Sequence, residues 1–215
     1  MKKLRAFTLM ELAIILFLIV ITVMIVLPHL IEDNKKLNAI AQWKDTYHNL
    51  EYIFSALKVQ SSKSDNKAFE NSVDDSNKEQ VLYNLLKSYL RMEDEISVNE
   101  YKTYYLNNSK VNAEDMYYIT NLHKTNSGKI VGLKWQNTPV RYSDKFPVAI
   151  MSVDLNGMKK PNKWGYDIFG INIYTDRIEP LGKTYDDYLL KSDCSKKGKG
   201  ISCSYYYYIY GGQLN

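Results

Sequence analysis

The sequence predicts an α+β fold, in which a long N-terminal, membrane-spanning α-helix packs on an antiparallel β-sheet head. Three observations lead to this prediction. An apolar run lies near the N-terminus, a stretch with helical apolar spacing follows it, and short β-prone runs separated by turn signals fill the second half of the chain. A length of 215 residues suits one ordinary domain plus an appendage.

The apolar run extends from Leu12 to Leu27, and Thr22 is its only polar residue before Pro28 ends it. As a helix, the segment from Phe7 to Leu27 is about 31 Å long, which matches the hydrocarbon core of a membrane. We therefore expect residues 7–28 to span the membrane. A secretory signal peptide has a shorter apolar region, followed by a cleavage site of small residues, and neither feature is present here.

Glu11 is the anomaly in this run, because an ionisable side chain at the centre of a membrane helix costs about 2.5–3.5 kcal/mol. Arg5 could snorkel toward it. If the chain were cut before Phe7, the new α-amino group would lie one helical turn from Glu11, on the same face. In a bundle of staggered copies, Glu11 of one subunit could then neutralise the amine of the next and set the axial register.

The segment from Lys2 to Leu12 (Lys-Lys-Leu-Arg-Ala-Phe-Thr-Leu-Met-Glu-Leu) resembles the cleavage and methylation signal of type IV prepilins and type II secretion pseudopilins. The resemblance implies that a prepilin peptidase cleaves between Ala6 and Phe7, that Phe7 is N-methylated, and that Glu11 acts in assembly. Pro28 matches the helix-kinking proline of these proteins. The sequence departs from the family at Ala6, where glycine is usual.

The resemblance also implies a pilin-like fold, a leader peptide over residues 1–6 and a structural role in a pilus or pseudopilus filament. The expected partners are other pilins or pseudopilins, copies of the chain itself, the prepilin peptidase, an assembly platform with its ATPase, and membrane lipid before assembly. Because basic residues precede the span, we expect a single pass through the bacterial inner membrane with the N-terminus in the cytoplasm. The assembled filament would be periplasmic or extracellular.

A minor or tip pilin is the alternative, with a head that binds DNA, a surface or a secreted substrate. The net charge is +4, and loss of residues 1–6 would lower it by three, to about +1. This near-neutral balance gives no clear indication of nucleic-acid binding. Three lysines near the C-terminus keep that alternative open, although they fit a solvated loop: Lys196, Lys197 and Lys199.

Residues 29–58 are predicted to continue the helix with one apolar face, and residues 59–215 to form the α+β head. The polar stretch from Gln60 to Lys78 is predicted to be a loop, and Glu79–Met92 is predicted to form a second helix. Hairpin turns are expected at 126–128 and 175–176. The expected strands are Met116–Leu122, Lys129–Trp135, Phe146–Val153, Ile168–Tyr174 and Arg177–Pro180.

Cys194 and Cys203 are the two cysteines of the chain. Because the head is expected outside the cytoplasm, a disulfide between them is predicted. It would close a small loop that is too polar to fold by apolar burial, and it would contribute about 2–3 kcal/mol.

Asp154, Asn156 and Asp167 lie between two predicted strands and carry the oxygen ligands that calcium prefers. An EF-hand is not supported, because Lys163 falls where its bidentate glutamate would be. Two interpretations stay open. The side chains could cap backbone groups in a Gly/Asn/Pro turn, or they could bind calcium, as some major pseudopilins do in a loop of this general region.

No enzymatic function is expected. The three histidines (His29, His48 and His123) have no metal-ligand spacing, and the sequence contains no Gly-rich phosphate loop and no Gly-x-Ser-x-Gly motif. An anchored enzyme whose groups converge from distant positions is the third hypothesis. Calcium aside, no cofactor is expected.

Overall fold

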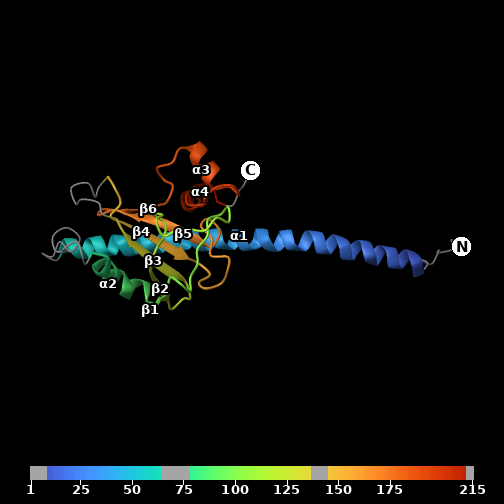
Figure 1. Cartoon of the computed structure of the whole chain (residues 1–215), viewed down its shortest axis with the longest axis horizontal. Coiled ribbons are helices and arrows are strands. Elements are labelled where there is room, and N and C mark those ends of the chain that lie inside the picture. Colours follow the sequence, from blue (N-terminus) through green and yellow to red (C-terminus); the bar gives the residue numbers. More distant parts are fainter. Residues whose placement is uncertain (1–8, 64–77, 137–144, 212–215) are drawn as a thin grey trace. The chain divides into compact units, whose positions relative to one another are not determined.

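The computed structural model describes residues 9–63, 78–136 and 145–211. It contains a long apolar helix at the N-terminus and an antiparallel sheet, which gives the chain an α+β class (Figure 1). The chain divides into two units, Met1–Asn38 and Ala39–Asn215. In order, the elements are α1 (Leu9–Lys63), α2 (Lys78–Leu90), β1 (Met92–Ile96), β2 (Asn121–Thr125), β3 (Ile130–Trp135), β4 (Ala149–Asp154), β5 (Ile168–Ile173), β6 (Ile178–Pro180), α3 (Asp187–Asp193) and α4 (Cys203–Tyr210).

The described part of the first unit is helical throughout. Pro28 lies inside α1. Because proline has no N–H, it cannot donate the usual hydrogen bond to the carbonyl of Met24, yet the helix continues past it. The predicted helical continuation beyond Pro28 is therefore present, but it is longer than predicted, because α1 extends to Lys63. The expected loop from Gln60 is thus wrong over residues 60–63, and its remainder up to residue 77 lies outside the described residues.

The second unit is built on six antiparallel strands in the order β1-β2-β3-β4-β5-β6, so each strand pairs with its neighbour in sequence. Both predicted hairpin turns form. The N–H of Thr125 donates to the carbonyl of Lys129 at 2.9 Å across a turn in which Gly128 has φ +82°. The N–H of Tyr174 donates to the carbonyl of Arg177 at 2.9 Å. Short turns of this kind keep consecutive strands adjacent.

One face of the sheet packs against helices. Since side chains alternate along a strand, Phe169, Ile171 and Ile173 of β5 all point to this face. The predicted apolar face of α1 is buried there at Ile40, Tyr47, Leu50 and Leu57, together with Trp43 and with Leu86 of α2.

The opposite face is covered mainly by irregular chain rather than by helices. Its core contains Ile130, Ile150 and Ile168 from the strands, with Tyr101 and Trp164 from the covering segments. Two glycines permit this close approach. A Cβ at Gly132 would lie 2.7 Å from side-chain atoms of Ile119 and Ser152, and one at Gly170 would lie 2.5 Å from Leu181. Both faces of the central strands are therefore buried.

The expected strand at 116–122 is wrong in position, because the observed strand is Asn121–Thr125. Residues 116–120 form no strand: the N–H of Tyr118 donates to the carbonyl of Asp115 at 3.0 Å, and Tyr117 packs edge-on against Trp164. The aromatic side chains of this segment pack against the core although its backbone is irregular. Because aromatic residues are also enriched in strands, the composition led to the wrong prediction.

Strand β1 and helices α3 and α4 were not predicted. The sequence of β1, Met-Glu-Asp-Glu-Ile, is mostly charged, as suits an edge strand. Helix α4 holds four consecutive tyrosines, a residue type enriched in strands. In the fold these residues are helical, and Tyr206 and Tyr207 are buried in the core between the sheet and the helices.

Candidate functional site

The first part of α1 exposes apolar side chains on all its sides. Every residue from Leu9 to Leu27 is exposed, and only Glu11 and Thr22 among them are polar. By length and composition, this is a helix that could cross a membrane. Thr22 satisfies its hydroxyl locally by donating to the carbonyl of Leu18 at 2.8 Å, which is how polar side chains are accommodated in apolar helices. A helix of this kind needs lipid or other apolar helices around it.

Glu11 lies near the start of the described part of α1. Its side chain is exposed, as are those around it. Ala6 and Phe7, the expected cleavage and methylation positions, lie outside the described residues. The structure thus places Glu11 and Pro28 on one helix, 17 positions apart.

Asp154, Asn156 and Asp167 are brought together at the end of the sheet, as the sequence suggested. Asp154 accepts hydrogen bonds at Oδ1 from the N–H groups of Asn156 and Gly157, both at 3.0 Å. Its Oδ2 accepts a hydrogen bond from the hydroxyl of Tyr101. These are the contacts of an Asx-turn, with one further donor from the loop that covers the sheet.

Asp167 holds the second half of the same loop. Its Oδ2 accepts from the N–H of Asn162 at 3.0 Å and from Nδ2 of Asn156 at 3.1 Å, and its Oδ1 accepts from the N–H of Lys163. All four carboxylate oxygens of Asp154 and Asp167 therefore accept hydrogen bonds from the chain itself. A calcium ion would have to compete with these donors, so this arrangement fits backbone capping and does not fit a preformed calcium site.

The two carboxylates of the loop are strongly buried, and burial shifts their pKa values. Asp154 is 1 % exposed and Asp167 3 %. Burial, reinforced by the charge of Asp167, raises the pKa of Asp154 to about 7, although the hydrogen bond from Tyr101 opposes this. Burial likewise raises the pKa of Asp167. Within the described residues, no three His, Cys, Asp or Glu side chains gather as a possible metal-binding group.

The predicted disulfide between Cys194 and Cys203 is present, with a Cα–Cα distance of 4.8 Å. It joins the end of α3 to the start of α4. Asp193 also organises the enclosed loop, because its carboxylate accepts from the N–H of Lys199 at 3.1 Å and from that of Ser202 at 2.7 Å. These two hydrogen bonds to Asp193 could not be predicted from the sequence.

The loop lysine Lys199 is engaged within the fold. Its ammonium lies 3.4 Å from Asp115 and 4.8 Å from the centroid of the Tyr105 ring. Its carbonyl accepts from the N–H of Leu106 at 3.0 Å. At least one of the three C-terminal lysines that kept DNA binding open thus has a role in packing.

The histidines whose side chains are described, His48 and His123, lie in different surroundings. His48 is exposed beside Glu51, at 3.3 Å. His123 is 6 % exposed, stacks on Tyr83 with ring centroids 4.1 Å apart, and contacts Oδ1 of Asn121 at 2.6 Å through Nε2. The contacts of both histidines are with neighbouring side chains of the fold. The side chain of His29 lies outside the described part of the chain.

Comparison with protein-family models, curated proteins and solved structures found no match to the chain.

Proposed function

We propose that the chain is a structural subunit of a type IV pilus-like or type II secretion pseudopilus filament. In this proposal a prepilin peptidase removes residues 1–6, and the mature chain is stored in the bacterial inner membrane. An assembly platform and its ATPase then transfer it into the filament. The observation that carries the proposal is one exposed carboxylate, Glu11, near the start of a helix that is otherwise apolar on every side.

The apolar surface of α1 suits such a subunit both in the membrane and in the filament. From Leu9 to Leu27 the helix presents no polar side chain except Glu11 and Thr22. In a membrane this surface contacts lipid. In a filament core it contacts the same surface of other subunits, and helix–helix packing replaces lipid contacts at little cost in hydrophobic free energy.

Glu11 supplies the specificity that apolar packing lacks. A carboxylate in an apolar surrounding is stable only with a partner. The α-amino group of a mature chain that begins at Phe7 is such a partner when it comes from the neighbouring subunit. Each correctly staggered contact then neutralises two charges, whereas each misaligned contact leaves both unpaired.

The proposal is tested by replacing Glu11. We expect Glu11→Ala and Glu11→Gln to leave membrane insertion intact, because both increase the apolar character of the helix. Incorporation into sheared filaments should fall by about tenfold or more. The α-amino group of the neighbouring subunit would lose its partner, and an unpaired buried charge costs several kcal/mol. Membrane fractionation measures the insertion, and immunoblotting of sheared filaments measures the incorporation.

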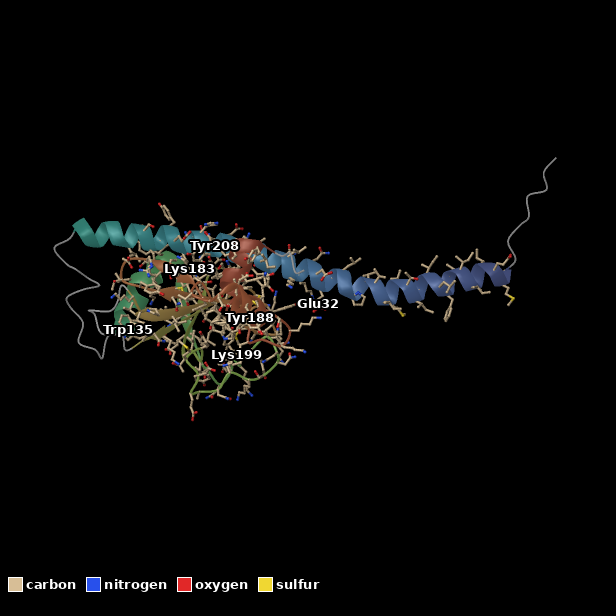
Figure 2. The ribbon with its side chains drawn as sticks, turned by 90° about the horizontal axis from the view of Figure 1, so that it is seen from above. Glu32, Trp135, Lys183, Tyr188, Lys199 and Tyr208 are labelled. Atoms are coloured by element: carbon tan, nitrogen blue, oxygen red, sulfur yellow. A yellow bond between two sulfur atoms is a disulfide. The ribbon has the colours of Figure 1, made fainter. Side chains whose placement is uncertain are left out.

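Glu32→Gln is the matched control. Glu32 is an exposed acid on the same helix, beyond the apolar run (Figure 2). We expect its replacement to leave filament incorporation unchanged. Normal incorporation of the Glu11 variants, or equal loss in the Glu11 and Glu32 variants, would contradict the role of Glu11 in register.

A further inference from the structure

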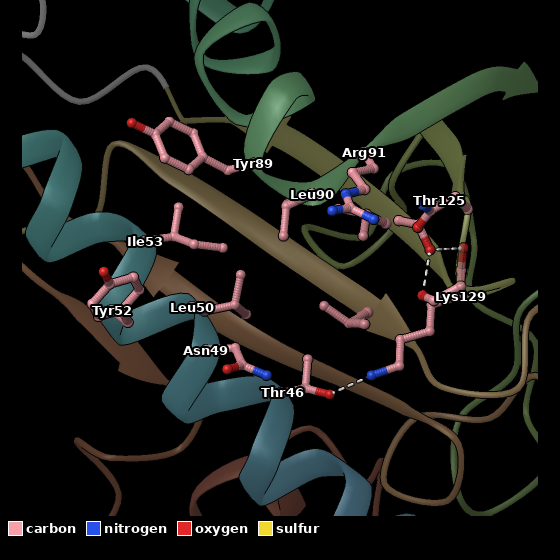
Figure 3. A pocket seen from close by; sticks show the side chains of 14 residues that line it. Thr46, Asn49, Leu50, Tyr52, Ile53, Tyr89, Leu90, Arg91, Thr125 and Lys129 are labelled. Carbon is pink, nitrogen blue, oxygen red and sulfur yellow. Dashed lines mark hydrogen bonds between the residues drawn. The ribbon is translucent and has the colours of Figure 1, made fainter.

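A pocket of about 400 Å³ lies within the unit Ala39–Asn215. One wall is the part of α1 that contains Thr46 and Asn49, and the opposite walls are the end of α2 and the β2–β3 hairpin (Figure 3). Its volume is within the range of about 300–1,000 Å³ that is usual for small-molecule sites. None of the residues discussed above as assembly, disulfide or calcium residues lines it.

The described lining of the pocket is basic. Among the described residues that line it, Arg91 and Lys129 carry positive charges and none is acidic. The ammonium of Lys129 reaches across to α1 and donates to Oγ1 of Thr46 at 2.7 Å. An ammonium group has three N–H donors, and Thr46 takes one of them. Burial lowers the pKa of Lys129, the charge of Asp45 opposes this shift, and a bound anion would oppose it further.

Both cationic residues are fixed to the same hairpin. The carbonyl of Arg91 accepts from the N–H of Asn126 at 3.1 Å. The carbonyl of Lys129 accepts from the N–H of Thr125 at 2.9 Å and from its hydroxyl at 3.1 Å. The backbone positions that carry the two side chains are therefore set by the fold before any ligand arrives, which lowers the entropic cost of binding.

The remaining lining combines three further kinds of group. Leu50, Val131 and Val153 are almost fully buried and give an apolar base. Hydroxyl and amide groups come from the hairpin and from α1, and Thr125 Oγ1 lies 2.9 Å from Ser127 Oγ. Tyr52 and Tyr89 are exposed aromatic residues: Tyr52 is 77 % exposed and Tyr89 is 43 % exposed.

We propose that this pocket binds a sugar acid, a pyranose-sized ring that carries a carboxylate. Arg91 and Lys129 recognise the carboxylate, and the planar guanidinium of Arg91 can bind both of its oxygens. Asn49, Asn126 and Ser127 donate to or accept from ring hydroxyls. The tyrosine rings and the apolar base cover the C–H faces of the ring. This proposal does not depend on filament assembly.

Saturation-transfer difference NMR on the full chain tests the proposal, in micelles of a detergent without a sugar headgroup. The probes are D-glucuronate, D-glucose and acetate. We expect contact signals from the ring protons of D-glucuronate, with affinity about tenfold higher than for D-glucose or acetate, because only D-glucuronate has both the charge and the ring.

Arg91→Gln and Lys129→Gln should each weaken D-glucuronate binding by about tenfold, since each removes a charged donor. Lys124→Gln is the control, because Lys124 is an exposed cation on the same hairpin that does not line the pocket. It should bind D-glucuronate as the unmodified chain does. Absence of binding, equal affinity for the three probes, or unchanged affinity in both pocket variants would overturn the proposal.

Discussion

Trp43 of α1 stacks on Phe169 of β5, with ring centroids 5.1 Å apart and ring planes 19° apart. Both side chains are fully buried. The indole N–H of Trp43 donates to the carbonyl of Ser204 in α4 at 2.8 Å. One side chain thus connects the helix, the sheet and the C-terminal helix within the unit Ala39–Asn215.

Trp43→Ala should therefore destabilise this unit strongly. Removing a buried aromatic side chain costs about 3–5 kcal/mol, and the carbonyl of Ser204 also loses its donor. Denaturant unfolding of the full chain in detergent, followed by circular dichroism, measures the change. Tyr52→Ala is the control, because Tyr52 is 77 % exposed on the same helix. Equal effects of the two substitutions would contradict the central position of Trp43.

The disulfide should stabilise the same unit. Replacement of Cys194 and Cys203 by serine removes a cross-link that closes a short loop, and we expect a loss of about 2–3 kcal/mol. A thiol reductant should lower the melting temperature of the unmodified chain and leave that of the double variant unchanged. A melting temperature that is insensitive to the reductant in both proteins would contradict this prediction.

Asp167 is predicted to act as an acceptor and not as a metal ligand. Asp167→Asn places an NH₂ group among N–H donors, so we expect it to cost about 1–3 kcal/mol. Added calcium should leave the melting temperature of the unmodified chain unchanged. A saturable rise with calcium that Asp167→Asn abolishes would establish the calcium site in place of the backbone-capping interpretation.

His123 should make stability depend on pH. Burial lowers its pKa; Glu95 opposes this shift and Lys87 adds to it. The folded state then binds fewer protons at this site than the unfolded state. Its contribution to stability is present above the unfolded pKa of about 6.5 and is lost as the pH falls through the lowered folded value.

The His123→Gln variant isolates this contribution from the buried carboxyls. We expect the difference in melting temperature between the unmodified chain and the variant to favour the unmodified chain less at about pH 5 than at about pH 7.5. A difference that stays constant over this range would contradict the assignment.

The elements with strong periodicity could be predicted from the sequence. The long helix, its buried face from Ile40 to Leu57, strands β3 and β5, and both hairpin turns follow from apolar spacing and turn residues. The disulfide followed from an expected location outside the cytoplasm. Each of these signals is local or depends on only two residues.

What could not be predicted depends on contacts between distant segments. The tyrosine-rich α4 is helical in a place where it covers the core and meets Trp43, and nothing in its own sequence indicates this. The pocket is equally non-local, because Arg91, Lys129 and Thr46 come together only when the helices and the hairpin pack. Tyr101, whose hydroxyl donates to Asp154 from a segment far away in the sequence, was missed for the same reason.

Identification of the N-terminal residue of the mature chain tests the proposed filament subunit most directly. Protein extracted from membranes of cells with an active prepilin peptidase should be digested and its N-terminal peptide sequenced by mass spectrometry. The proposal predicts a peptide that begins at N-methylated Phe7. A peptide that still begins at Met1 in those cells would contradict it.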